Sequence, residues 1–482
     1  MSKVKKVEKT ANKYQYLAGN IALFTVGNFV SKLLVFFLVP LYTNELTTSE
    51  YGVADLLQVT LLLLVPALTE NIGEAALRFG IEESGKRGSI LRTGLKAILR
   101  ADIIVTAAGI VLIAIWRGDI GRYLFFFIVL FITDALYEFL ILYFQGSEMV
   151  PAVVIGSIVS TAVMIVCNIL FLLVFKIGLT GYILSQVTAY IFASAAMLII
   201  GRMGGGISLD KEDSELKAQM YEYSRPMLFY STGSWINNAS DRYIVLAMLG
   251  TAVNGVYGVA YKIPAILMVF QRIFAQAWQM SATKSYADEK SGEFFSQMYR
   301  IYNSFMVMGC AVLILIVRPL ASIIFRKDFY EAWMLVPPLL ISVIFGALTG
   351  FLGSICLAYK DSKSMGIATM TGALLNVVLN IVSIPYIKAQ GAAWATAISY
   401  GIMCLLAGMF VRKHVKLEHN VVKEIVSYML LVAESIVMIC DFGHAYILCA
   451  IITIAVIILY LGEARKIVAK FYELLRQRLK KH

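Results

Sequence analysis

Four cationic side chains stand inside long apolar segments of the sequence: Lys32, Arg242, Lys262 and Arg272. A charge at the centre of a lipid bilayer costs on the order of a few kcal/mol or more, so such a residue usually faces a hydrated internal cavity. Pro264 predicts a kink immediately after Lys262. If the segments are helices that meet around one axis, the four cations line a common cavity. We therefore predict that they bind an anionic ligand.

Two of these cations also have a less specific interpretation. Arg242 directly follows Asp241 and could pair with it, or its long side chain could extend to the outer membrane surface. Arg272 could reach the inner surface in the same way. Lys32 lies midway along its apolar segment and reaches neither surface easily, so a functional role explains it better.

Two acidic side chains, Asp134 and Glu138, are four residues apart and therefore lie on one face of a predicted helix. In a low-dielectric environment two neighbouring carboxylates tend to share a proton, because ionising both is costly. They are candidates for proton coupling or for balancing the charge of Lys32, and the sequence does not separate these roles. Asp55 and Asp241 are further candidates for ion coupling or counter-charge.

Charged residues also step by four at the inner end of the apolar segment 51–68: Glu70, Glu74 and Arg78. This is the spacing of a helical ion pair, which would join Glu74 to Arg78 near the membrane surface. The functional alternative is that Arg78 meets an anionic group at the cytoplasmic mouth of a transport path.

The composition indicates that the elements carrying these residues are membrane helices. The 482 residues are 59% hydrophobic and 15% charged, whereas soluble domains are nearer to one quarter charged. Apolar stretches of about 20 residues recur along the chain, each long enough to cross a hydrocarbon core. Because these runs are continuous and do not alternate, they predict helices and not a barrel. The fold class is therefore an all-α polytopic membrane protein.

About fourteen transmembrane helices are predicted. Most lysines and arginines fall in the even-numbered loops and the two tails, so the positive-inside rule puts both termini in the cytoplasm. The net charge of +11 follows from this topology and does not indicate nucleic acid as a partner. The predicted spans lie near residues 18–42, 51–68, 95–116, 123–144, 151–175, 180–200, 226–248, 254–278, 301–325, 332–357, 364–386, 391–411, 424–440 and 444–462.

An internal repeat indicates two lobes. The segment YGVAD beginning at Tyr51 recurs as YGVAY beginning at Tyr257, in each case after a short outside loop. With six helices in each half, the copies have the same orientation, a parallel repeat with its pseudo-twofold axis along the membrane normal. The predicted divisions are 1–201 for the N-lobe, 202–225 for a cytoplasmic linker, 226–411 for the C-lobe, 424–462 for two extra helices and 463–482 for a basic amphipathic tail.

The sequence offers little for catalysis, cofactors or metals. The six cysteines lie in or beside apolar spans without a CxxC pair, and the four histidines lie in loops or at the C-terminus. Residues 80–86 match GxxxxGK, but Arg87 stands where a phosphate-binding loop needs Ser or Thr, and no strand precedes it. We predict no catalytic residue, no cofactor and no metal.

Three segments together resemble the Wzx-type polysaccharide flippases, a family within the superfamily that also contains MATE antiporters and peptidoglycan lipid flippases. They are GNFVSKLLVFFLVPLYTNELTTSEYGVADL at 27–56, AALRF at 75–79 and SDRYIVLAMLGTAVNGVYGVAYKI at 240–263. The resemblance implies a V-shaped fold of two lobes with alternating access in a bacterial cytoplasmic membrane. It also implies that Lys32, Arg78, Arg242 and Lys262 occupy cavity or gate positions.

The substrate implied by the resemblance is an oligosaccharide on a polyprenyl pyrophosphate. This agrees with the charge argument, since a pyrophosphate needs a hydrated, positively lined path through the bilayer. Membrane lipids are further partners, and a polysaccharide polymerase and glycosyltransferases are candidate partners.

The sequence leaves two other functions as alternatives. A MATE-like exporter of organic cations coupled to H⁺ or Na⁺ should present acids to its substrate, and Asp134 and Glu138 keep that alternative open. A membrane glycosyltransferase, polymerase or ligase would need a large outside domain, and all predicted outside loops are short.

Overall fold

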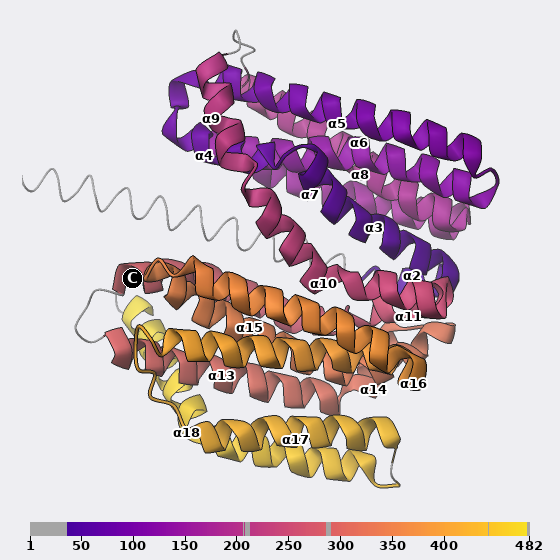
Figure 1. Cartoon of the computed structure of the whole chain (residues 1–482). Helices are drawn as coiled ribbons and strands as arrows, with labels where there is room; N and C mark the ends of the chain where they lie inside the picture. The colour runs from indigo at the N-terminus through magenta and orange to yellow at the C-terminus, as the bar shows by residue number, and fades with distance from the viewer. Residues whose placement is uncertain (1–35, 206, 208–212, 286–290, 442, 480–482) are drawn as a thin grey trace, which may run out of the picture. The chain divides into compact units, whose positions relative to one another are not determined.

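The computed structural model of the chain describes residues 36–205, 207, 213–285, 291–441 and 443–479 (Figure 1). Every regular element among these residues is helical, which confirms the predicted all-α fold. Most of the predicted first span, 18–42, lies outside the described residues. Lys32 lies outside them as well.

The chain divides into two compact units, residues 1–236 and 237–482. In the described part of unit 1, seven α-helices are longer than ten residues. Its helical elements are α2 (Val39–Glu45), α3 (Thr48–Leu68), α4 (Ile72–Glu82), η1 (Ser84–Lys86), α5 (Arg87–Ile115), α6 (Asp119–Gly146), α7 (Val150–Asn168), η2 (Ile169–Val174), α8 (Gly178–Met203) and α9 (Ser214–Ser224).

The helix α10 (Met227–Leu249) carries the chain from unit 1 into unit 2. Unit 2 continues with α11 (Thr251–Ala260), α12 (Pro264–Ser285), α13 (Ser291–Leu315), α14 (Val317–Ile324), η3 (Lys327–Leu335), α15 (Val336–Ala358), α16 (Ser362–Val411), α17 (Val421–Cys440) and α18 (Ala445–Leu479).

Within the described parts of the chain, nine helical segments are long and apolar enough to cross a membrane, or ten if the bent pair α11 and α12 forms one span. The segment α16 is counted once but contains two predicted spans, because non-helical backbone at Ile387 and Lys388 separates its halves. The chain is therefore a multi-pass membrane protein. The number fourteen stays a prediction.

The kink predicted at Pro264 is confirmed. The axes of α11 and α12 differ by 50°, and Pro264 is the first residue of α12. Proline suits this position because its missing N–H is one that a helix start leaves unbonded. Lys262 lies in the break between the two helices and is half-buried.

Local signals determine where α3 begins and ends. Thr47 caps its N-terminus, with the Thr47 side chain accepting a hydrogen bond from the Glu50 N–H and Glu50 bonding back to the Thr47 N–H. At its other end Glu70 and Asn71 both have φ of 53°, a left-handed conformation that stops the helix before α4. Glu70 consequently belongs to neither helix.

Close helix packing in unit 1 depends on glycine. A Cβ on Gly146 of α6 would lie 2.6 Å from the carbonyl oxygen of Leu77 on α4, and one on Gly94 of α5 would lie 2.1 Å from the ring of Phe139. Small residues of this kind let membrane helices approach closely. They fix α4 and α5 against α6, and so fix the charged residues that α4 and α5 carry.

Aromatic rings hold α12, α13 and α15 together in unit 2. Phe274 stacks on Tyr302 with ring centroids 4.0 Å apart, and Trp278 stacks on Phe351 at 4.1 Å. The indole Nε1 of Trp278 also donates to the carbonyl oxygen of Phe351 at 3.0 Å. The following pair α17 and α18 matches the two extra predicted helices, and α18 continues as a helix through most of the predicted tail.

Candidate functional site

The centre of the candidate site in unit 2 is Asp241, a nearly fully buried acid on α10. Its Oδ2 accepts hydrogen bonds from the hydroxyls of Tyr257 at 2.5 Å and Tyr261 at 2.8 Å. The two tyrosines are four residues apart and so share one face of the helix that ends at Ala260. A carboxylate removed from water needs such donors, because burying a charged group without hydrogen bonds costs on the order of several kcal/mol.

Arg242 is positioned by the same group. Its backbone N–H donates to Asp241 Oδ1 at 2.9 Å, and its guanidinium carbon lies 4.6 Å from the centre of the Tyr261 ring. A guanidinium over an aromatic face is held by a cation–π interaction. Asp241 therefore fixes Tyr261, and Tyr261 fixes Arg242. Lys262 is the next residue after Tyr261, whereas Arg272 lies farther along α12 with an exposed side chain.

A second buried polar group in unit 2 lies on the two halves of α16, and sequence reasoning missed it. Asn376 Nδ2 donates to Thr396 Oγ1 at 3.2 Å, and Asn380 Nδ2 donates to Asn376 Oδ1 at 3.0 Å. The signal was available, since two asparagines four residues apart in an apolar segment share a helix face. The group ties the two halves of α16 together.

The acids predicted in unit 1 are both on α6, as expected. The carboxyl of Asp134 contacts the hydroxyl of Tyr190 on α8, whose ring stacks on Tyr137 at 4.9 Å. Glu138 is more exposed than Asp134. Asp55 is a half-buried residue of α3, the helix that joins α8 through a hydrogen bond between Gln58 and Gln186. The role of these acids stays a prediction.

The predicted ion pair between Glu74 and Arg78 is wrong. Arg78 Nε lies 3.2 Å from Glu82 Oε1, one turn farther along α4, and the guanidinium carbon lies 4.5 Å from the Tyr223 ring centre. Both partners of the ion pair are about half exposed, so the pair itself adds little stability. Arg78 is held against α9, which the sequence did not reveal.

Glu70 has its own partners, because the left-handed turn directs it away from the face of Glu74. Its carboxylate pairs with Arg100 of α5 and with Arg225 at the end of α9. Burial opposes its ionisation, but the hydrogen bond from Arg225 and the charge of Arg100 outweigh this effect, so the pKa of Glu70 lies below its usual value. One carboxylate thus joins three segments of unit 1.

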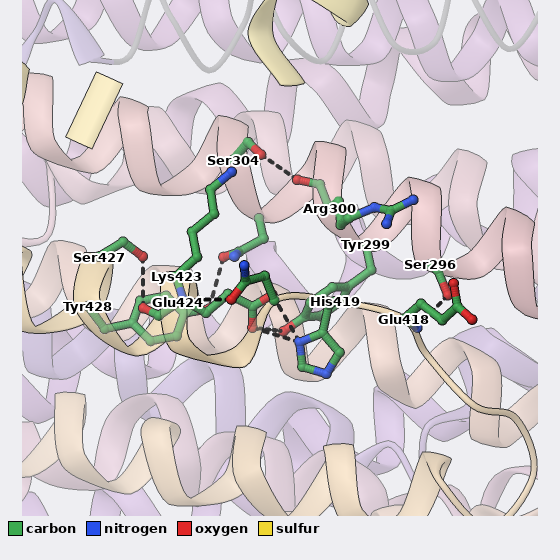
Figure 2. Close-up of polar contacts among 12 residues, drawn as sticks. Ser296, Tyr299, Arg300, Ser304, Glu418, His419, Lys423, Glu424, Ser427 and Tyr428 are labelled. Carbon is green, nitrogen blue, oxygen red and sulfur yellow. Dashed lines mark hydrogen bonds and ion pairs between the residues drawn. The ribbon is translucent and has the colours of Figure 1, made fainter. Parts of the chain in front are cut away.

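A third polar cluster, shown in Figure 2, lies where α13 meets the start of α17. Glu424 is 8% exposed and accepts hydrogen bonds from Tyr299 at 3.2 Å and from His419 Nδ1 at 3.0 Å. Lys423 pairs with Glu463 of α18 at 2.7 Å. Neither acid was a candidate from the sequence, because Tyr299 is 125 residues away from Glu424 along the chain and Lys423 is 40 residues away from Glu463.

No group of three or more His, Cys, Asp or Glu side chains among the described residues is arranged to hold a metal ion. Among the described intramembrane charges, Asp241, Arg242 and Asp134 are each held by tyrosine side chains. Such positions usually serve passage or gating through a membrane protein.

Residues 17–282, more than half of the chain, match the sequence model of a family described as polysaccharide biosynthesis proteins. The chain belongs to this family. No curated protein sequence matches it. The matched range includes every cation predicted for the cavity and Arg78.

Solved structures show the fold of this transporter. It is similar to an inward-facing multidrug resistance MATE family transporter of the MOP superfamily, with TM-score 0.65, 12% identity and coverage of 82% of this chain and 97% of the other. It is equally similar to the lipid II flippase MurJ in an inward closed conformation, with TM-score 0.65, 16% identity and coverage of 94% and 99%.

A third similar structure is a MOP superfamily transporter from Pyrococcus furiosus, with TM-score 0.53, 12% identity and coverage of 82% and 92%. At these identities the likeness shows the fold, which is the MATE-like and MurJ-like fold that the sequence predicted. The family and the similar structures are flippases and transporters and not enzymes.

Proposed function

We propose that the transporter moves a polyprenyl-pyrophosphate-linked oligosaccharide from the cytoplasmic to the outer leaflet by alternating access. The observation that carries this proposal is the match to the polysaccharide biosynthesis family across residues 17–282. That range contains Lys32, Arg242, Lys262 and Arg272, the cations proposed to line the path. Arg78 is proposed to act at its cytoplasmic mouth.

The chemistry of the substrate supports this assignment. A pyrophosphate carries about two negative charges, and an isolated ion crossing hydrocarbon meets a barrier of tens of kcal/mol in idealised estimates. Fixed cations along a hydrated path lower that barrier, while the polyprenyl tail remains in the lipid. The guanidinium of Arg242 suits this role, because arginine binds phosphate oxygens in a bidentate geometry.

The proposed setting is a bacterial cytoplasmic membrane with both termini in the cytoplasm. The two lobes are proposed to be 1–201 and 226–411, joined by the linker 202–225. The pair 424–462 and the basic tail from 463 onward are proposed to lie outside the repeat. A polymerase and glycosyltransferases are the proposed functional partners, since they would consume and produce the carried glycan.

The proposal is tested with purified protein in liposomes that contain a fluorescent, pyrophosphate-linked glycolipid. We expect the inner-leaflet probe to become accessible to an impermeant quencher faster than in protein-free liposomes. An equal rate in both preparations would exclude this function for the purified chain.

A MATE-like cation antiporter is the second candidate, because a MATE transporter is as similar in fold as the flippase. The buried carboxylate of Asp241 is a group that such a transporter could use. The same liposomes discriminate the two functions if they are loaded with an organic cation under a proton or sodium gradient. Gradient-driven cation movement without glycolipid movement would favour the antiporter.

Asp134 and Glu138 should determine whether a proton gradient drives transport. Replacing them by Asn and Gln removes both titratable groups and preserves shape and hydrogen bonding. We expect basal translocation to continue and its stimulation by an imposed proton gradient to disappear. Translocation is measured with and without the gradient, and unchanged stimulation in the double variant would show that this pair does not couple protons.

A further inference from the structure

A cavity of about 310 Å³ lies in unit 1, apart from the intramembrane charges discussed above. Its volume is at the lower end of the roughly 300–1,000 Å³ typical of small-molecule sites, so it suits a headgroup and not a whole glycan. Its lining residues come from α5 and α9 and include no acid. They are Thr93, Lys96, Arg100, Lys217, Tyr221 and Arg225.

Helical spacing explains why these residues converge. Lys96 and Arg100 are four apart on α5, and Lys217, Tyr221 and Arg225 repeat at the same spacing along α9. Residues four apart share one helix face. The basic face of α9 therefore lies against the basic face of α5, and Figure 1 shows α9 across the ends of α4 and α5.

The position of α9 is fixed at its N-terminus. The Asp213 carboxylate accepts hydrogen bonds from the N–H groups of Glu215 and Leu216, which caps the helix. Asp213 also pairs with Lys86 at 2.9 Å, and its own N–H donates to Ser89 Oγ at 2.9 Å. The lysine holds the pKa of Asp213 below its usual value. The cavity thus has two fixed walls.

The charge in the cavity is one-sided. Four of the six lining residues are cations, and Glu70 is the carboxylate that Arg100 and Arg225 share. The guanidinium carbons of Arg100 and Arg225 lie 5.8 Å and 5.1 Å from the Tyr221 ring centre, so both are kept in place. Like charges held together in this way repel, and a bound anion relieves the repulsion.

An unused hydrogen-bonding group lies in the same wall. Thr93 is 1% exposed, and its Oγ1 has no hydrogen-bond partner among the described residues. Buried hydroxyls are nearly always hydrogen-bonded, so an orphan of this kind needs an explanation. A phosphate oxygen would accept its proton while the surrounding cations bind the other oxygens.

The depth of the cavity indicates the source of the anion. The predicted span on α5 begins near residue 95, so Lys96 lies at the membrane boundary. Arg100 is one turn deeper, about 6 Å at 1.5 Å per residue. Lipid phosphates lie just outside the hydrocarbon boundary, next to Lys96, and the long side chain of Arg100 can extend back toward them. Basic side chains near the cytoplasmic surface attract anionic headgroups.

We propose that the α5–α9 cavity binds a lipid-borne phosphate group at the cytoplasmic membrane surface. Two lipids carry that chemistry: the polyprenyl pyrophosphate of the proposed substrate and an anionic phospholipid of the same leaflet. The proposal rests on the proposed orientation of the chain. In the first case the cavity is an initial docking site that concentrates substrate beside the transport path.

The test measures lipid binding by the full-length protein and requires no transport. Lys96→Gln/Lys217→Gln removes two cations from the cavity without touching the ion pairs of Glu70. The matched control Arg117→Gln/Arg122→Gln removes the same charge at the other end of α5 and the start of α6. Fluorescent polyprenyl pyrophosphate and fluorescent phosphatidylglycerol are titrated separately into each protein in neutral nanodiscs.

We expect the cavity variant to bind at least one of the two lipids about tenfold or more weakly, because it lacks two of the cations that would hydrogen-bond the phosphate. The control should bind as the unaltered protein does. Preferential loss of polyprenyl pyrophosphate binding identifies the substrate as the source, and preferential loss of phosphatidylglycerol binding identifies the phospholipid.

Unchanged affinity for both lipids in the cavity variant would overturn the proposal, as would an equal loss in the control. If the double variant does not fold, Thr93→Val and Lys217→Gln are measured singly, and wild-type affinity for both lipids in both variants has the same meaning. The two proposals fail separately. If the protein moves no glycolipid but its lipid binding still depends on the cavity, only the proposed function is contradicted.

Discussion

Replacing Arg242 by alanine is expected to lower glycolipid translocation by roughly 10- to 100-fold, the effect of losing one charged hydrogen bond of about 1.5–3 kcal/mol. Its guanidinium is held over Tyr261 by a chain of contacts that begins at the buried Asp241. The side chain of Arg242 is therefore already positioned before substrate binds. Since α10 contains no other lysine or arginine, no residue of that helix can replace the lost charge. Lys32→Ala should have an effect of the same kind.

Arg242→Lys separates charge from geometry. Lysine keeps the positive charge but cannot form the planar, bidentate contact, so we expect activity between those of the wild type and the alanine variant. Arg122→Ala is the matched control, since Arg122 pairs with Asp119 in an exposed position at the start of α6. Translocation is measured in liposomes at equal protein density. Wild-type translocation rates in Lys32→Ala, in Arg242→Ala and in the double variant Lys32→Ala/Arg242→Ala would contradict the cationic path.

The sequence predicted the helices of this fold because their signal is local. An apolar run of sufficient length has to become a helix in lipid, whatever surrounds it. The bend at Pro264 was predictable for the same reason, since proline alone removes the hydrogen bond that would continue the helix. Asp241 and Arg242 were recognised as candidates because a charge in an apolar segment is conspicuous without knowledge of its neighbours.

The partners of those charges were not predictable, because they depend on how helices pack. Glu70 was grouped with Glu74 on the assumption of one continuous helix, and the left-handed turn at Glu70 and Asn71 separates them. Its actual partner Arg100 comes from α5. Likewise, the spacing of Lys217 and Arg225 puts both on one face of α9, but only the packing of that face on α5 makes a cavity lined by cations.

The cluster around Glu424 is the clearest case of long-range contact and leads to the largest expected effect on stability. Glu424→Ala removes the carboxylate that accepts hydrogen bonds from Tyr299 and His419. Tyr299 belongs to α13, and His419 lies just before α17 (Figure 2). Each buried group left without a partner costs about 1–3 kcal/mol. We expect the thermal unfolding temperature of the purified protein to fall by several degrees, with Glu424→Gln in between because the amide retains one acceptor oxygen.

Glu418→Ala is the matched control for that measurement. Glu418 is exposed and contributes its backbone N–H, which donates to Ser296 Oγ at 2.8 Å and remains after the substitution. A double-mutant cycle then distinguishes a specific bond from general loss of packing. If Tyr299 acts through Glu424, Glu424→Ala/Tyr299→Phe should lose less stability than the two single variants together. Strict additivity, or equal destabilisation by Glu418→Ala, would mean that this carboxylate does not hold α17 against α13.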